Sequence, residues 1–316
     1  MPGFVDAFLH HPLFLMEGAL GTRLAGEYSL ATDPDVALAA HVYGAEGRSA
    51  LGEIWGGYAA VAHRRGLPFL ANTPTRRANR ERAALSRYGE AIIRDNVAFL
   101  RSLAEGYEAE SYVGGTIGCK GNAYTGEGAL GENEAREFHA WTVERFARAG
   151  ADYLFAGIMP ALPEAIGLAR ACSAVDVPYI ISFMITAAGR LVDGTPIADA
   201  ILAIDGATAK PPLCYATNCV HPAAAASALA APWNDSASVR RRFQGIMANA
   251  SPLSPEELDG TDSVRQSSPA ELADSLRRMS ERMNIRIVGG CCGTDETYLD
   301  ALAACCIQSA SDGRKS

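Results

Sequence analysis

Residues 177–185 read VPYIISFMI, a continuous run of apolar and β-branched side chains. A strand with one solvated face alternates apolar and polar residues, and this run has almost no such alternation. Continuous hydrophobicity over this length is typical of a parallel strand that is buried on both faces. The stretch therefore predicts a buried parallel strand.

Seven similar runs recur along the chain, separated by segments with helical periodicity. They are residues 13–20, 67–73, 111–118, 152–160, 212–220, 242–251 and 285–293. Eight buried strands that alternate with helices predict an α/β fold, the closed (β/α)8 TIM barrel, with an open doubly wound sheet as the alternative.

One of the connecting helices can be described in detail. Segment 132–152 is expected to form a helix that buries Phe138, Trp141 or Thr142, and Phe146 on one stripe, and that stops near Gly150.

Length and composition favour one folded domain. The chain has 316 residues, of which 48% are hydrophobic and 20% are charged, close to the average of globular proteins. Barrels of this kind commonly reach such a length as a single unit. We expect one domain over residues 1–316, with 311–316 as a frayed tail.

Charge and hydropathy limit the partners of the protein. The net charge is −8, and the nearest basic run, RRANRER at 76–82, is expected to open a solvated helix rather than to bind nucleic acid. The N-terminal segment lacks the basic and apolar regions of a signal peptide, and no apolar run reaches the roughly 20 residues that span a bilayer. These patterns predict a cytoplasmic protein without a membrane partner.

Polar residues directly after the apolar runs are candidates for function, because active sites of such barrels lie at the C-terminal ends of the strands. These candidates are Glu17 after the first run, Asn72 and Thr73 at the end of the second, Asn218 and Cys219 at the end of the sixth, and Cys291 and Cys292 at the end of the eighth.

Three of these candidates are cysteines. Cys219 is too far from Cys291 and Cys292 in sequence for a local zinc finger, but a barrel would deliver all three to the same rim. Glycines at 289, 290 and 293 would let the adjacent pair depart from the opposite-facing geometry of a strand. Three thiolates on Zn²⁺ leave a fourth position open, as in catalytic zinc sites, and an external thiol could bind there as a nucleophile.

Other interpretations of these residues carry less weight. Five cysteines are expected in the core: Cys119, Cys172, Cys214, Cys305 and Cys306. A reducing compartment disfavours disulfides, including a strained vicinal one at 291/292. His221 is a weaker ligand candidate than Cys219 and is expected to be solvated. The glycines at 126, 128 and 131 match a dinucleotide-binding pattern only weakly and are assigned to a loop.

The chain resembles the homocysteine S-methyltransferase family over nearly its whole length. The resembling segments are EGALGTRL (17–24), ANT (71–73), VGGTIG (113–118), AYTGE (123–127), ISFMITAAGRLVDGTPIADAI (181–201), TNCVHP (217–222) and VGGCCGT (288–294). The Asn-Cys segment and the Gly-Gly-Cys-Cys-Gly segment together are highly specific.

The resemblance implies a zinc-dependent barrel enzyme of methionine biosynthesis with small-molecule substrates. Cys219, Cys291 and Cys292 would bind Zn²⁺, and the homocysteine sulfur would take the open position and receive a methyl group to form methionine. Glu17, Gly18 and Ala19 would hold the amino-acid end, and Asn72, Thr73 and Asn218 would complete the substrate site. The short chain implies a small sulfonium donor, S-methylmethionine or S-adenosylmethionine.

The chain departs from the family pattern beside the expected acceptor. Gly157 and Ile158 replace a Glu-Thr pair, Pro74 replaces an aromatic residue, and Glu17 replaces an Asp. These departures leave two alternatives open: a different thiol or selenol acceptor, or a non-catalytic relative that binds zinc and thiols. A zinc hydrolase is disfavoured, because none of the 6 histidines forms a ligand set at strand ends.

Overall fold

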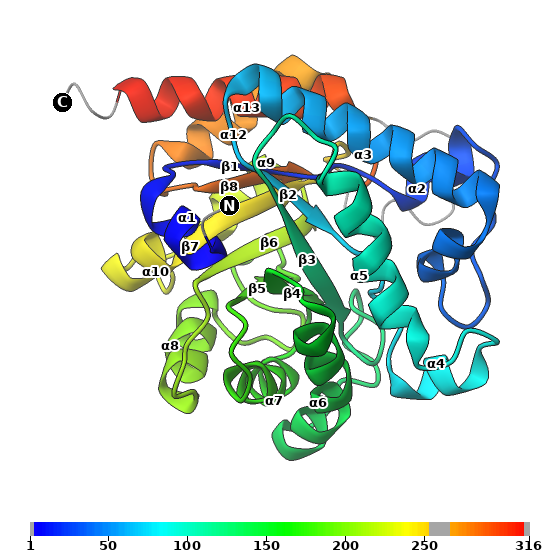
Figure 1. Cartoon of the computed structure of the whole chain (residues 1–316). Helices are drawn as coiled ribbons and strands as arrows, with labels where there is room; N and C mark the ends of the chain where they lie inside the picture. The colour runs from blue at the N-terminus through cyan, green and yellow to red at the C-terminus, as the bar shows by residue number, and fades with distance from the viewer. Residues whose placement is uncertain (1–2, 253–265, 313–316) are drawn as a thin grey trace.

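Eight parallel strands close into one barrel in the computed structural model, which describes residues 3–252 and 266–312 (Figure 1). The strands are β1 (Phe14–Met16), β2 (Phe69–Asn72), β3 (Ser111–Gly118), β4 (Tyr153–Met159), β5 (Tyr179–Phe183), β6 (Cys214–Val220), β7 (Phe243–Ala248) and β8 (Ile287–Gly290). Each strand lies within one of the eight predicted runs. The pairing of β1 with β8, through Phe14↔Ile287 and Leu15↔Val288, closes the barrel and confirms the predicted fold.

Helices connect the strands and surround the barrel (Figure 1). They are α1 (Phe4–His10), α2 (Gly21–Gly26), the 3-10 helix η1 (Leu38–Tyr43), α3 (Ala45–Arg65), α4 (Arg80–Leu85), α5 (Ala91–Ala104), α6 (Glu132–Ala149), α7 (Leu162–Ser173), α8 (Ile197–Ala207), α9 (Pro222–Leu229), α10 (Ala237–Arg242), α12 (Pro269–Ser280) and α13 (Glu296–Asp312). Within the described ranges, no helix combines the length and apolar character needed to cross a membrane.

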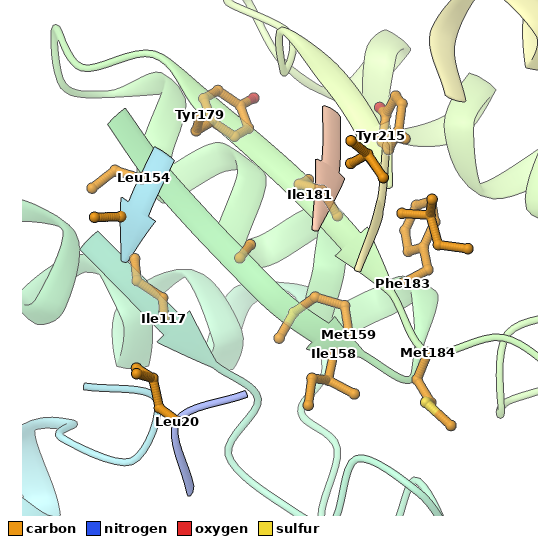
Figure 2. Packing of buried hydrophobic residues seen from close by; sticks show 14 of the residues in the cluster. Leu20, Ile117, Leu154, Ile158, Met159, Tyr179, Ile181, Phe183, Met184 and Tyr215 are labelled. Atoms are coloured by element: carbon orange, nitrogen blue, oxygen red, sulfur yellow. The ribbon is translucent and has the colours of Figure 1, made fainter. Parts of the chain in front are cut away.

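Two apolar layers hold the barrel together. The larger one lies between the strands and the outer helices, and Figure 2 shows part of it, where the rings of Phe183 on β5 and Tyr215 on β6 stack with centroids 5.3 Å apart. The smaller layer fills the barrel interior and includes Phe4 and Phe8 of α1. The ring of Phe4 stacks on Tyr153 at 4.6 Å, so that α1 packs against the interior side chains of the barrel.

Helix α6 confirms one local prediction and corrects another. It ends at Ala149, and Gly150 follows in the left-handed conformation (φ 76°) that glycine adopts most readily. Its buried stripe contains His139 in place of Phe138, which is only half-buried. The His139 ring can face inward because its Nε2 lies 3.1 Å from the Glu164 carboxylate, which is itself fully buried.

The C-terminal end of the chain also differs from expectation. Helix α13 continues to Asp312, so residues 311 and 312 belong to a helix rather than to a frayed tail. Positions 313–316 of the predicted tail lie outside the described residues.

Candidate functional site

A cavity of about 380 Å³ lies at the carboxyl ends of the barrel strands. Its lining includes every residue predicted from the sequence: Glu17, Gly18, Ala19, Asn72, Thr73, Asn218, Cys219, Cys291 and Cys292. These positions come from the ends of β1, β2, β6 and β8, which the closed barrel delivers to one rim. The structure therefore brings together all of the candidates.

Three sulfur atoms converge on one side of this cavity. The Sγ atoms of Cys219, Cys291 and Cys292 all lie within 4.8 Å of one another. Cys219 and Cys291, whose Cα atoms are 5.4 Å apart, are joined as a disulfide, whereas Cys292 is a free and exposed thiol. The sequence pattern predicts free thiols at all three positions. The structure pairs two of them because β6 and the turn after β8 bring their short side chains into direct contact.

An irregular strand end positions Cys219. The pairing of β6 with β7 shifts register between Asn218 and Val220, and Cys219 between them has φ 60°. A bulge of this kind turns a side chain away from the direction that a regular strand would give it. Ile158 on β4 has a similar conformation (φ 57°), which is uncommon for a β-branched residue. Its N–H donates to the Asn218 Oδ1 at 3.1 Å, which links the two irregular strand ends.

A turn after β8 positions the adjacent cysteines. The N–H of Cys291 donates to the Ala248 carbonyl at 2.8 Å, and the carbonyl of Cys292 accepts from the N–H of Ala250 at 3.1 Å. Gly293 completes the turn at φ 77°. Because the pair lies in a turn rather than in an extended strand, both sulfur atoms reach the same cluster. The glycines around the pair therefore allow the departure from strand geometry that the sequence predicts.

Glu17 is a carboxyl group at the inner end of the cavity. Its Oε2 accepts the Trp55 indole N–H at 2.7 Å and the backbone N–H of Asn72 at 2.8 Å. Burial raises the pKa of Glu17 to about 8, and these hydrogen bonds only partly oppose the rise. The side chain is therefore largely protonated at pH 7.

A tyrosine of α3 fixes the loop after β1. The Tyr58 hydroxyl, which is fully buried, donates to the carbonyl of Ala19 at 2.7 Å. A Cβ at Gly18 would lie only 2.8 Å from the Tyr58 ring, so glycine is needed for this close approach. The backbone of the cavity wall is consequently held rigid from outside the cavity.

The predicted polar residues of β2 and β6 also form internal hydrogen bonds. Asn72 Oδ1 accepts from the Tyr153 hydroxyl at 3.0 Å, and Thr73 Oγ1 accepts from the N–H of Thr116 at 3.2 Å. Asn218 Oδ1 accepts from the Ser182 hydroxyl at 2.6 Å in addition to its bond from β4. These side chains therefore fix strand ends around the cavity as well as lining it.

Two arginines that line the cavity are not among the site residues predicted from the sequence. Arg76 and Arg77 line the cavity, whereas the basic run that contains them was expected to open a solvated helix. Helix α4 begins only at Arg80, so the first part of the run lies in the loop after β2. Their place in the sequence could have identified them, because both follow the end of β2 within five residues, where barrel enzymes place functional side chains.

His221 also differs from the prediction. It is buried rather than solvated, with 8% of its surface exposed, and burial lowers its pKa. Its Nδ1 accepts from the N–H of Ala223 at 3.2 Å, which caps the start of α9. Among the residues that the structure describes, the metal-competent cluster contains the three cysteines without His221.

Crystal structures of one bacterial enzyme share this fold. The metallated form of the homocysteine methyltransferase MmuM from Escherichia coli has a TM-score of 0.71 and 23% identity, with 95% of this chain and 98% of that chain covered. The oxidized form gives 0.71 and 23%, with 96% and 98% covered, and the apo form gives 0.65 and 21% with the same coverage. No curated protein matches the chain significantly.

An eight-stranded parallel barrel with converging cysteine sulfurs at its C-terminal rim defines a barrel enzyme with a thiol-based site. The chain belongs to the homocysteine S-methyltransferase family, whose sequence model matches residues 14–306. It is a thiol methyltransferase with small-molecule substrates.

Proposed function

We propose that the protein is a zinc-dependent S-methyltransferase that moves a methyl group from a sulfonium donor to the thiol of homocysteine and forms methionine. The observation that carries this proposal is the convergence of three cysteine sulfurs within 4.8 Å at the edge of a cavity large enough for a small substrate. The single domain that we infer for residues 1–316 contains both the sulfur cluster and the cavity.

The donor set supports zinc as the metal. Three sulfur ligands favour a soft or borderline ion, and a set of three leaves one tetrahedral position for a substrate. Cys219, Cys291 and Cys292 would hold the ion once the Cys219–Cys291 pair is reduced, because thiolates rather than disulfide sulfurs are ligands. When bound, zinc would supply a nucleophilic acceptor sulfur at neutral pH by favouring loss of the thiol proton.

The chain itself supplies alignment. Gly18 and Ala19, held by Tyr58, would position the amino-acid end of the acceptor, and Asn72, Thr73 and Asn218 would position the reactants from the ends of β2 and β6. A new bond forms between the acceptor sulfur and the methyl carbon as the bond between that carbon and the donor sulfonium breaks. The electron pair stays on the donor sulfur and neutralises its positive charge. Holding both reactants in line contributes several kcal/mol in general terms.

A donor and acceptor panel tests this function. The reduced, zinc-loaded protein should be incubated with homocysteine and either S-methylmethionine or S-adenosylmethionine, and methionine should be measured by mass spectrometry. We expect methionine from at least one donor, and loss of the product in the Cys219→Ser variant. If no methylated thiol forms with either donor, whether the acceptor is homocysteine, another thiol or a selenol, the proposed function is wrong.

A further inference from the structure

The charged side chains that line the cavity are unbalanced. Apart from the cysteines, they are Glu17, Arg76 and Arg77 among the residues that the structure describes. Glu17 is largely protonated at pH 7, because burial raises its pKa to about 8. The two guanidinium groups keep their charge, so the part of the cavity wall that they line favours an anion.

The two arginines have no acidic partner among the residues that the structure describes. Within residues 3–252 and 266–312, no carboxylate lies within 4.0 Å of the charged nitrogens of Arg76 or Arg77. The pKa of Arg77 is lowered by burial and by the positive charges of Arg82 and Arg76. Arg82 donates to the carbonyl of Asp35 at 2.7 Å rather than to a carboxylate, and so adds positive charge without neutralising it.

The end of β3 leaves space for the Arg76 side chain. A Cβ at Gly118 would lie 2.6 Å from Arg76 Cγ and 2.6 Å from the Arg76 carbonyl oxygen. The aliphatic part of Arg76 therefore lies directly over a strand end that has no side chain of its own. Arg76 lines the cavity while much of its side chain stays exposed.

Glu17 is poorly suited to bind a cationic group. Its Oε2 already accepts two hydrogen bonds, from Trp55 and from Asn72, and its carboxyl group is mostly neutral at pH 7. Gly157, at the end of β4 next to the cavity residues Phe155 and Thr116, contributes no side chain. Among the residues that the structure describes, no carboxylate other than Glu17 lines the cavity to pair with an ammonium group.

We propose that Arg76 and Arg77 bind the carboxylate of the acceptor and that its ammonium group is not recognised, so that the substrate class is short thiols ending in a carboxylate. This inference rests on the proposed function and deepens it. Homocysteine is one member of the class. Its analogue without the amino group, γ-mercaptobutanoate, is a second member, whereas the analogue without the carboxylate, γ-aminopropanethiol, is excluded.

Calorimetric titration of these three thiols into the reduced, zinc-loaded protein tests the proposal without a methyl donor. We expect γ-mercaptobutanoate to bind within about threefold of homocysteine, and γ-aminopropanethiol to bind about 10- to 100-fold more weakly, the usual range for loss of charge-assisted hydrogen bonds. The difference should shrink at high salt, because both arginines are exposed. Equal affinity for the amino and carboxyl analogues would overturn the proposal.

Paired variants assign the effect to the two arginines. The double variant Arg76→Met, Arg77→Met should weaken both carboxylated thiols about 10- to 100-fold and leave γ-aminopropanethiol unchanged. Arg80→Met is the matched control, since this exposed arginine lies on the same segment but does not line the cavity. A double variant that binds all three thiols like the wild type, or that changes only the KM of the donor, would show that these arginines do not bind the acceptor.

A variant that gains affinity for an ammonium group provides a second, independent test. The atoms nearest to a Cβ at position 157 belong to the Phe155 ring, at 3.3 Å, and to Thr116, at 3.9 Å, so Gly157→Glu can add a carboxylate next to the cavity if the ring shifts slightly. We expect this variant to raise the affinity for γ-aminopropanethiol and to leave that for γ-mercaptobutanoate unchanged or lower. Unchanged affinity for both analogues would contradict the absence of ammonium recognition in the wild type.

The outcome for binding and the outcome for methyl transfer can be separated. If carboxylated thiols bind selectively but no donor yields a methylated product, the proposed function fails and the assignment of the arginines stands. If methionine forms but γ-mercaptobutanoate neither binds nor is methylated, the proposed function stands and this inference fails.

Discussion

At the scale of single residues, Glu17 is a hydrogen-bonded carboxyl group whose pKa is raised by burial. Its ordinary pKa is near 4.5, and burial raises it to about 8 in the folded chain. The folded state therefore retains a proton that the unfolded state loses between these values. This contribution to stability is fully present below about pH 4.5 and is lost as pH rises through about 8.

Replacing Glu17 by Gln removes this titration while keeping an oxygen that can accept from Trp55. We predict that the stability of the wild type relative to Glu17→Gln falls as pH rises from about 5 to about 8, as measured by urea denaturation. The indole N–H resonance of Trp55 should titrate in the same range in the wild type and stay constant in the variant. A wild-type resonance that shifts near pH 4.5 instead would show an ordinary carboxyl group.

The cysteine cluster gives a second prediction at the residue scale. Reduced protein is expected to carry about one zinc per chain, and Ser at position 219, 291 or 292 should lose most of it, because each replacement removes one of three thiolates. Cys119→Ser is the matched control, since this half-buried thiol follows β3 but lies outside the cluster. Elemental analysis after gel filtration measures the metal. Full zinc content in Cys291→Ser would rule out the three-thiolate site.

At the scale of elements, α1 contributes to the barrel although it precedes the first strand. The ring of Phe4 is 4% exposed and lies 5.3 Å from Tyr112 and 4.6 Å from Tyr153, centroid to centroid. We predict that Phe4→Ala lowers the free energy of unfolding by about 3 kcal/mol, in the range for large-to-small changes in cores. Chemical denaturation measures the change.

Leu9→Ala is the control for this prediction, because Leu9 lies on the same helix with 71% of its surface exposed. Its effect should stay within about 0.5 kcal/mol, as for surface substitutions in general. If both variants were equally stable, α1 would not be packed against the barrel interior in solution.

Irregular strand ends show how elements shape the site. The register shifts of β4 near Ile158 and of β6 near Cys219 lie on strands that Asn218 connects through hydrogen bonds. Backbone conformations of this kind cost of order 1–3 kcal/mol each and persist only where surrounding contacts determine them. Both conformations occur at the cavity, so the rest of the fold must stabilise these unfavourable backbone angles beside the sulfur cluster.

At the scale of the whole molecule, the barrel does not depend on a metal for its core. Closure through β1 and β8 and the two apolar layers involve many fully buried side chains away from the cysteines. We predict that reduced protein treated with a chelator still unfolds cooperatively, and that added zinc raises the thermal midpoint. The stabilisation should reach about 2.7 kcal/mol when free zinc is 100 times its Kd.

The Cys292→Ser variant serves as the control for metal binding, and its midpoint should respond little to zinc. Thermal unfolding followed by circular dichroism measures both proteins. Loss of cooperative unfolding after chelation would show that the metal is part of the folding core, contrary to the prediction.

The amino-acid pattern was enough to predict the barrel and most of the candidate site residues. A parallel strand buried on both faces must be apolar along its length, and this requirement is local, so runs such as 177–185 predict their own structure. Once eight strands are recognised, the rule that their carboxyl ends meet at one rim already groups Glu17 with Cys219 and Cys291.

The interactions between these groups could not be predicted from the sequence, because they form only in the folded chain. The disulfide contact of Cys219 with Cys291, the pKa of Glu17 and the burial of His221 each depend on atoms from segments far apart in the sequence. Arg76 was assigned to a solvated helix because nothing in its neighbouring residues reveals the bare strand end at Gly118 over which it lies. Hydrophobic patterns are properties of short segments, whereas burial and charge balance are properties of the space that the folded chain encloses.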